Sequence, residues 1–379
     1  MIRNGIKNLI KQVIVHFPGK KVIMLESAPD LSDSPKAVFD EMLAQGWDKK
    51  YRFVWWVSDK KKDLPRFRST CYVDRNSYVN GLLKWMYQYR AHCLISCNLF
   101  LEKLREDQVS FYITHGTGIK KTSDAYVLPD GIDYAITASE HTRENTAKDM
   151  HAAVERFYGL GYPRNDILTK AGRDLHECLQ GDFDKVIVWY PTFRQHKNAK
   201  NYEGAKHALP ILHDAEQAKK LNDIAARYRT LIVLKPHFAQ DLSYIKNLAL
   251  SHIRFIQDNF FLENKLSSYE FVGSCDALIT DYSSIYYDHL LCDKHVAAVW
   301  EDIDEYRENV GFSVDVDYYL KGAEKIYNLN NFETFIRHVA EGEDPLKAER
   351  AELNALVNYA SDGKNTERVL SFIQEKAGL

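Results

Sequence analysis

The sequence predicts an α/β protein in which two domains, each built on a doubly wound parallel sheet, face a cleft. The length of 379 residues suits two domains of ordinary size. Short apolar runs alternate with helical patterns along most of the chain, and the alternation restarts after Gly161-Tyr162-Pro163. Continuous apolar strands separated by helices are typical of parallel sheets that helices cover on both faces.

The strands and helices are expected in alternating order. Strands of the first sheet are predicted at 22–25, 53–57, 93–96, 111–114 and 134–138, with helices at 34–43, 77–89 and 140–150. Strands of the second sheet are predicted at 186–190, 231–234, 253–256, 277–280 and 296–300. We therefore expect a first domain over 1–170, a second over 171–345, and a charged helical tail over 346–379.

Composition excludes several classes of protein. The net charge of -3 argues against general nucleic-acid binding, which usually requires a strongly basic face. The six cysteines contain no C-x-x-C pair, so they predict buried thiols in a reducing compartment rather than a zinc site or disulfides. No secretory signal is visible, and no apolar run reaches the roughly 20 residues of a membrane span. A cytoplasmic protein is expected.

Two segments suggest contact with a membrane surface. Apolar residues recur at helical spacing over 2–14 among Arg3, Lys7 and Lys11, which is typical of a basic amphipathic helix. Trp85 and several tyrosines lie in the helix expected at 77–89, and such side chains favour the water–lipid boundary. The first helix could instead pack its apolar face on its own domain, which is the commoner case, and the second could lie in an ordinary core or at a contact with another subunit of a homo-oligomer.

Polar residues follow four predicted strands at the ends where ligands of parallel sheets bind. A helix is predicted directly after the last of these segments, at 285–291. Its first N–H groups, its dipole and two small hydroxyls would suit a phosphate or pyrophosphate, although Asp281 and Ser284 could instead cap the helix. The four segments are His115-Gly116-Thr117-Gly118, Pro191-Thr192-Phe193-Arg194, Lys235-Pro236-His237 and Asp281-Tyr282-Ser283-Ser284.

With Gly161-Tyr162-Pro163-Arg164-Asn165-Asp166, these segments resemble the CDP-glycerol glycerophosphotransferase family, the teichoic acid primases and polymerases of Gram-positive bacteria and related capsule enzymes. The resemblance runs from about residue 22 to residue 312. It implies a GT-B-like fold of two Rossmann-type domains and peripheral attachment to the inner face of the cell membrane. It also implies transfer of glycerol phosphate from CDP-glycerol to a hydroxyl of a lipid-linked teichoic acid or capsular polysaccharide, releasing CMP.

The sequence departs from the family pattern in three places. Gly118 stands where the family usually has proline, and Lys321-Gly322 replaces a usual Pro-Gly. A further histidine that the polymerases carry ahead of the 277–280 strand has no clear equivalent. These departures leave the alditol and the acceptor open, so a CDP-ribitol-dependent enzyme is an alternative.

The resemblance and the chemistry together assign roles to the polar residues. His115 is expected to be the general base, because a histidine with a pKa near ~6.5 can take the proton of an attacking hydroxyl. Gly116 and Thr117 are assigned to substrate binding, since a glycine lets an acceptor come close. The alternative is a turn histidine that binds nothing. Arg164, Asn165 and Asp166 are interpreted as hinge or helix-capping residues.

The remaining assignments concern the nucleotide. Ser283 and Ser284 are expected to hold the pyrophosphate, and Asp281 to cap the helix or orient a neighbouring donor. Arg194 and Lys235 are expected to bind phosphate oxygens, and a protonated His237 to stabilise the departing CMP. Glu270 is a candidate for the ribose hydroxyls, with an exposed helix residue as the alternative.

No required metal or cofactor is predicted, because no acidic cluster with metal-ligand spacing is visible. A metal-dependent phosphatase is disfavoured for the same reason. Two rivals stay open at this point: a GT-B glycosyltransferase that uses a nucleotide sugar, and a non-catalytic assembly protein that retains a nucleotide site.

Overall fold

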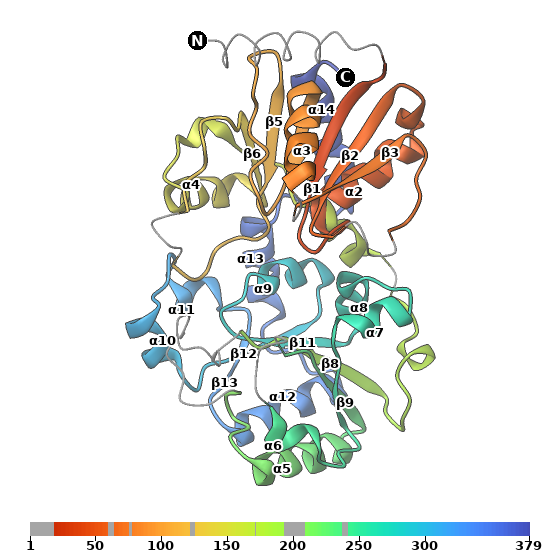
Figure 1. Ribbon diagram of the computed structural model, residues 1–379. Helices are drawn as coiled ribbons and strands as arrows, with labels where there is room; N and C mark the ends of the chain where they lie inside the picture. Colours follow the sequence, from red (N-terminus) through yellow and green to blue (C-terminus); the bar gives the residue numbers. More distant parts are fainter. Residues whose placement is uncertain are drawn as a thin grey trace. The chain divides into compact units, whose positions relative to one another are not determined.

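The computed structural model describes residues 19–59, 64–75, 78–121, 126–170, 172–192, 209–236 and 242–379. The chain divides into two compact units. Unit 1 comprises Met1–Thr117, Asp124–Asp166 and Asp362–Leu379, and unit 2 comprises Gly118–Ser123 and Ile167–Ser361. Each unit contains one sheet, and every strand pair described in either sheet is parallel (Figure 1). The predicted fold class, two parallel-sheet α/β domains, is confirmed.

The sheet of unit 1 has seven strands in the order β3-β2-β1-β4-β5-β6-β7. The order reverses beside β1, which pairs with β2 on one side and with β4 on the other. The strands are β1 (Lys21–Glu26), β2 (Tyr51–Val57), β3 (Thr70–Asp74), β4 (Ala91–Ser96), β5 (Val109–Ile113), β6 (Tyr134–Thr137) and β7 (Phe157–Gly159).

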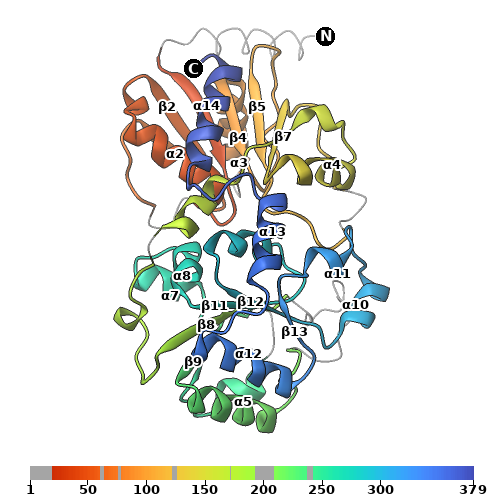
Figure 2. The same cartoon turned by 180° about the vertical axis from the view of Figure 1, so that it is seen from behind.

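Helices cover both faces of this sheet because its strands are apolar on both sides. In β1, Leu25 joins the cluster that contains Phe39 of α2 and Leu370 of α14, whereas Met24 joins the cluster bordered by Leu83 of α3. Figure 2 shows α2 and α14 lying together over one face. Among the described residues, the α-helices of unit 1 are α2 (Asp33–Ala44), α3 (Tyr78–Arg90), α4 (Glu140–Asp149) and α14 (Asn365–Ala377).

The sheet of unit 2 repeats this plan with six strands in the order β10-β9-β8-β11-β12-β13. Here the order reverses beside β8, which pairs with β9 and with β11. The strands are β8 (Lys185–Trp189), β9 (Thr230–Leu234), β10 (Ile253–Phe255), β11 (Ala277–Thr280), β12 (His295–Val299) and β13 (Glu324–Ile326).

Alternate residues again point to two helical layers. Leu234 of β9 packs in the cluster that contains Leu221 of α5 and Phe335 of α12, and Val233 packs in the cluster that contains Phe271 of α8. The longer helices are α5 (Ala215–Arg227), α12 (Leu329–Glu341) and α13 (Lys347–Val357). Short helices complete the unit: α6 (Ser243–Lys246), α7 (Asp258–Glu263), α8 (Ser268–Ser274), α9 (Ile285–His289), α10 (Ile303–Asn309) and α11 (Val316–Tyr319).

The ten expected strands are all present, with bounds within two residues of the prediction. Three strands were not predicted: β3, β7 and β13. Each lies at an edge of its sheet and has three to five residues, of which at least one is only half-buried. An edge strand has one neighbour, so it lacks the continuous apolar run that identifies a central strand.

The segment from residue 346 is helical as expected, with α13 in unit 2 and α14 in unit 1. The domain limits themselves stay predictions. The amphipathic helix expected over 2–14 lies outside the described residues. Within the parts of the chain that are described, every helix is too short or too polar to cross a bilayer.

Candidate active site

His115 lies in unit 1, in the loop that follows β5. Its position is set by Thr114, whose hydroxyl lies 2.8 Å from that of the buried Tyr162 and donates to the Ile136 carbonyl. The His115 side chain itself is exposed, and its ring is hydrogen-bonded to the backbone of Cys97, just beyond β4. The histidine is therefore accessible at the carboxyl edge of the sheet while its neighbours hold it.

An ion pair lies close to this imidazole. Arg164 Nη1 is 2.8 Å from Asp33 Oδ2, and both side chains are largely buried. The guanidinium also sits over the Tyr162 ring, 5.2 Å from its centroid. Asp33 adopts a φ of +59°, a left-handed conformation that is uncommon outside glycine and is often found at functional sites.

The surroundings of His115 favour its neutral form. Desolvation by surrounding protein atoms lowers the pKa of His115 below 6.5, and the positive charge of Arg164 lowers it further. Asp33 and the Cys97 backbone act in the opposite direction. A ring with this pKa is unprotonated at neutral pH, which is the state that a general base requires.

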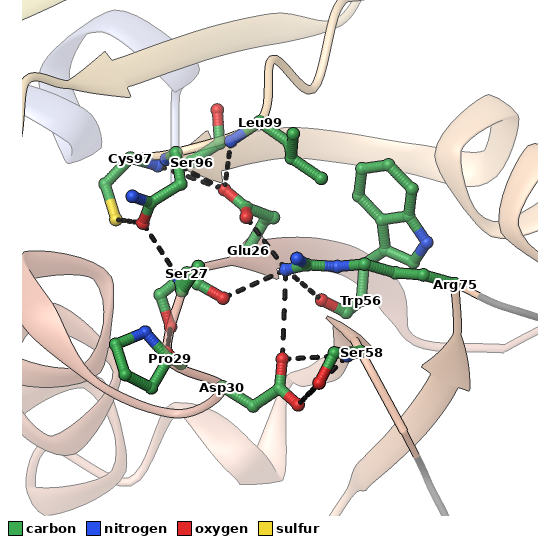
Figure 3. Close-up of polar contacts among 12 residues, drawn as sticks. Glu26, Ser27, Pro29, Asp30, Trp56, Ser58, Arg75, Ser96, Cys97 and Leu99 are labelled. Atoms are coloured by element: carbon green, nitrogen blue, oxygen red, sulfur yellow. Dashed lines mark hydrogen bonds and ion pairs between the residues drawn. The ribbon is translucent and has the colours of Figure 1, made fainter. Parts of the chain in front are cut away.

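The point where strand order reverses in unit 1 contains a buried carboxylate. Glu26, the last residue of β1, is fully buried and accepts N–H groups from the turn after β4. Its other oxygen lies 2.8 Å from Arg75 Nη2. Figure 3 shows the Arg75 side chain between Glu26, Asp30 and the backbone carbonyls of Ser27 and Trp56.

Unit 2 brings three of the polar segments to one edge, because β9, β8 and β11 are neighbours and their carboxyl ends meet. Asp281, which is fully buried, accepts hydrogen bonds from the backbone N–H of Thr192 at 2.8 Å and from its hydroxyl. It also accepts from the N–H of Tyr282 at 2.7 Å. Asp281 therefore joins the loops after β8 and β11, and the expectation that it orients a neighbouring donor fits this geometry.

Ser283 and Ser284 precede α9, the helix expected after the strand. Their backbone carbonyls accept from Tyr286 and Tyr287, and the Ser284 hydroxyl makes no capping bond to the helix. Both side chains are half-exposed. The two hydroxyls are thus placed beside the first turn of a short helix and remain accessible to a ligand.

Lys235 follows β9 at the same edge. Its ammonium lies 3.0 Å from Asp258 Oδ1 and within 6 Å of the ring centres of Tyr190 and Phe261. The hydroxyl of Tyr190, which follows β8, is buried and has no hydrogen-bond partner among the described residues. A cation and an unused phenol therefore flank the strand ends where a polar ligand would bind.

The remaining predicted site residues have mixed outcomes. Arg194 and His237 lie outside the described residues. Gly116 and Thr117 follow His115 in unit 1, and the buried Thr117 hydroxyl has no partner within the described chain. Glu270 forms a capping box with Ser267, accepting from its N–H at 3.4 Å while the Ser267 hydroxyl accepts from the Glu270 N–H. Its proposed contact with ribose stays a prediction.

The segment 161–166 has two roles in unit 1: it caps α14, and it places Arg164 where its charge acts on His115. Asp166 caps α14, accepting from the N–H groups of Asn365 and Thr366 at 2.8 Å. Gly161 is required because a Cβ there would lie 2.0 Å from Asn365 Oδ1. Arg164 was interpreted as structural, but its positive charge also lowers the pKa of His115. Its ion-pair partner Asp33 was not identified from the sequence.

The described residues hold no group of three or more His, Cys, Asp or Glu side chains suited to a metal ion. Metal-independent chemistry stays a prediction.

Comparisons with known proteins agree on one family. Residues 9–375 match the family described as CDP-Glycerol:Poly(glycerophosphate) glycerophosphotransferase. The chain is 26% identical to a teichoic acid poly(glycerol phosphate) polymerase of Bacillus spizizenii over a 344-residue alignment, which covers 82% of this chain and 82% of that protein. It is 25% identical to a teichoic acid glycerol-phosphate transferase of Staphylococcus aureus over 85% of this chain and 87% of that protein.

A solved structure of the wall teichoic acid polymerase TagF superposes on the whole chain with a TM-score of 0.73 at 20% identity, covering 97% of that chain. This likeness confirms the GT-B-like fold. The match over residues 9–375 decides the family: the chain belongs to the CDP-glycerol:poly(glycerophosphate) glycerophosphotransferases and is a transferase.

Proposed function

We propose that this transferase moves glycerol phosphate from CDP-glycerol to a hydroxyl group of a lipid-linked teichoic acid or capsular polysaccharide, with release of CMP. Family membership supports the reaction class. The observation that supports the residue assignment is the edge of unit 2 where three strands end side by side. There Lys235, the Thr192–Asp281 pair and two accessible serines lie at the carboxyl ends of β9, β8 and β11.

The proposed reaction is a direct in-line displacement. The acceptor oxygen forms a bond to the β-phosphorus of CDP-glycerol, its proton passes to the His115 imidazole, and the bond to the CMP oxygen breaks with its electron pair. Serine hydroxyls, Lys235, Arg194 and His237 stabilise the phosphate charge. Positioning and electrostatics supply most of the rate in reactions of this class.

The neutral state of His115 supports its role as the base. Its pKa is lowered by desolvation and by Arg164, so the ring holds a free lone pair at neutral pH. Its exposure leaves that lone pair accessible to an acceptor hydroxyl. After transfer the proton leaves to water, and Asp33 offsets the positive charge that the ring acquires meanwhile.

We also propose peripheral attachment to the inner face of the cell membrane, where a lipid-linked acceptor is found. Helix α3 supports this proposal. Leu82 is 68% exposed on it, and Trp85 stacks on Tyr89 with 5.5 Å between ring centres. Aromatic side chains of this kind favour the water–lipid boundary.

The test is turnover by the purified full chain, with CDP-glycerol and a lipid-linked acceptor, followed as CMP release and as product mass. Substitution His115→Ala should lower kcat by about 10²–10⁴-fold, because one positioned base contributes that much. His141→Ala, at an exposed histidine of α4, is the matched control and should have ordinary activity. Full turnover by His115→Ala would remove that residue from the base role.

A panel of donors separates the rivals. CDP-glycerol, CDP-ribitol and UDP-sugars are offered with one acceptor, and the mass added to the product identifies the donor used. Glycerol phosphate is expected. Addition of a sugar would indicate a glycosyltransferase, ribitol phosphate a ribitolphosphotransferase, and no CMP release with any acceptor a non-catalytic protein.

A further inference from the structure

We propose that Glu26 and Arg75 are positioning residues for the His115 imidazole, through the turn after β4 that they hold in place. The proposal rests on the proposed function in one respect, namely that His115 is the base. Neither residue is expected to touch substrate.

The first step is the attachment of Glu26 to the turn. Glu26 Oε2 accepts hydrogen bonds from the N–H groups of Asn98 at 3.1 Å and Leu99 at 2.9 Å, and a longer one from Cys97 at 3.4 Å. Three successive N–H groups facing one carboxylate form a concave anion site within the protein itself. Because the carboxylate is fully buried, the conformation of this turn depends on it.

The second step is the cation that completes the site. Arg75 follows β3, and its Nη2 donates to Glu26 Oε1 and, at 2.9 Å, to the Ser27 carbonyl. The guanidinium also lies over the Trp56 ring at 5.2 Å. Arg75 thereby joins the ends of β1, β2 and β3, while Glu26 adds the end of β4. Burial raises the pKa of Glu26, whereas the N–H groups and Arg75 favour its ionised form.

The third step leads from this turn to the base. The residue whose N–H faces Glu26 is Cys97, and the backbone of Cys97 is also hydrogen-bonded to the His115 ring. In addition, Asn98 Oδ1 accepts from the Ala28 N–H at 2.7 Å, which fixes the start of the loop that ends at Asp33. The turn therefore connects the Glu26–Arg75 pair both to the imidazole and to the carboxylate of the neighbouring ion pair.

The Glu26–Arg75 ion pair lies where the strand order of the sheet reverses, and this position suggests why a buried ion pair is present. A buried ion pair is seldom retained for stability alone, since apolar replacements of similar volume are often as stable. Here the pair occupies the reversal of strand order, where the loops after β1 and β4 separate and cannot hydrogen-bond to each other as strands do. A carboxylate spanning this gap gives the turn a fixed conformation.

The experiment uses the full chain with Glu26→Gln and Arg75→Lys. In Glu26→Gln one carboxylate oxygen becomes an N–H₂ group, which must face either Arg75 or the N–H groups of the turn, so one of the two attachments is lost. We expect kcat to fall by about 10²-fold, the cost of misplacing a catalytic group by roughly 1 Å. KM for CDP-glycerol should stay unchanged, because the proposed nucleotide residues lie in unit 2. Arg75→Lys keeps the positive charge, so its kcat should lie between that of Glu26→Gln and that of the unmodified protein.

A second measurement needs no turnover. The His115 ring resonance is identified in histidine-labelled protein by its loss in His115→Ala, and it is followed as a function of pH. The groups that act on this ring are Arg164, Asp33 and the Cys97 backbone. In Glu26→Gln the hydrogen bond between the Cys97 backbone and the ring should weaken, and because that bond raises the pKa of His115, the pKa should fall further below 6.5.

The matched control is Asp133→Asn. Asp133 forms an ion pair with Lys103 at 2.6 Å and accepts from the Ser110 N–H, at the amino-terminal edge of the same sheet. It should lower stability without altering kcat or the His115 titration. The proposal is overturned if Glu26→Gln and Arg75→Lys leave both readouts unchanged, or if Asp133→Asn changes them equally. Full activity of His115→Ala would instead refute the proposed base, and the ring titration would still test the positioning.

Discussion

Both sheets have a buried carboxylate where their strand order reverses, but the two carboxylates have different hydrogen-bond partners. In each unit the strand order reverses beside the first strand, and a fully buried carboxylate spans the loops that separate there. Glu26 in unit 1 binds three backbone N–H groups and the cation of Arg75. Asp281 in unit 2 binds the N–H and hydroxyl of Thr192 and the N–H of Tyr282.

The difference follows from what each edge is proposed to do. In unit 1 the backbone of one residue, Cys97, lies between the Glu26 carboxylate and the proposed base His115. Glu26 is held there both by backbone N–H groups and by the positive charge of Arg75. In unit 2 the Asp281 carboxylate is fully buried and accepts from Thr192, whereas the Ser283 and Ser284 side chains are half-exposed. Lys235, at the same edge, pairs with Asp258. A buried anion thus organises each loop pair without presenting its charge to a phosphate.

Each unit also has a histidine close to this region, and the two are in opposite environments. His115 is exposed and bonded to the Cys97 backbone. His289 ends α9, is fully buried, and has no hydrogen-bond partner for either ring nitrogen among the described residues. Burial lowers the pKa of His289 to about 3. Both lowered pKa values leave the rings neutral at neutral pH, but only His115 is exposed.

The largest expected effect comes from deleting the two carboxylates. Glu26→Ala removes the nearer of the two carboxylates beside Arg75, at 2.8 Å against 3.8 Å for Asp30, and should cost about 3–5 kcal/mol of stability. Asp281→Ala removes the acceptor of the hydrogen bonds from Thr192 and Tyr282, at about 1–3 kcal/mol for each bond lost. Hydrogen exchange should show faster opening of unit 1 in the first variant and of unit 2 in the second. Loss of protection spread evenly over both units would contradict two independent anchors.

The next effect concerns His289. Its pKa is about 3 when folded and 6.5 in the reference state, so its contribution to stability is present above 6.5 and is lost as the pH falls toward 3. His289→Leu removes this dependence. Relative to the unmodified protein, the variant should gain about 2 kcal/mol between about pH 7.5 and about pH 5, at about 1.4 kcal/mol per pH unit.

Chemical unfolding of unit 2 at a series of pH values measures this gain. His141→Leu, at an exposed histidine, should show no comparable change. If His289→Leu behaves like His141→Leu, the buried histidine is not the acid-sensitive group.

The pH dependence of catalysis tests the other histidine. Because the pKa of His115 is lowered from 6.5, kcat/KM should be constant through neutral pH and should decrease only at a pH below 6.5. Once the ring is protonated, kcat/KM should decrease by about tenfold for each further pH unit. The residual activity of His115→Ala should lack this acid limb. An acid limb that persists in His115→Ala would assign the titration to another group.

The smallest effect is expected at the serines. Ser283→Ala and Ser284→Ala should each raise KM for CDP-glycerol by about 5–10-fold, the equivalent of about 1–1.5 kcal/mol for one lost hydrogen bond. Ser251→Ala is the control, because Ser251 is an exposed serine near the amino end of β10 in the same unit. An unchanged KM in both serine variants would remove the hydroxyls from the nucleotide site.

The sequence by itself determined the fold class and the central strands. Continuous apolar runs such as the one ending at Leu25 are a property of strands buried on both faces, and this burial is a local signal. The segments around His115, Lys235 and Ser283 were visible because each follows such a strand. Family membership could be inferred from the same segments.

Tertiary structure decided how those residues are held. Edge strands such as β3 form only beside a neighbouring strand. The pairing of Asp33 with Arg164 joins residues 131 positions apart, and the contact of Glu26 with Arg75 joins residues 49 positions apart. A buried carboxylate carries no periodic signal, because its partners are backbone N–H groups and a distant cation that any residue order could supply. Long-range electrostatic pairing in a desolvated interior therefore becomes apparent only when the strands lie side by side.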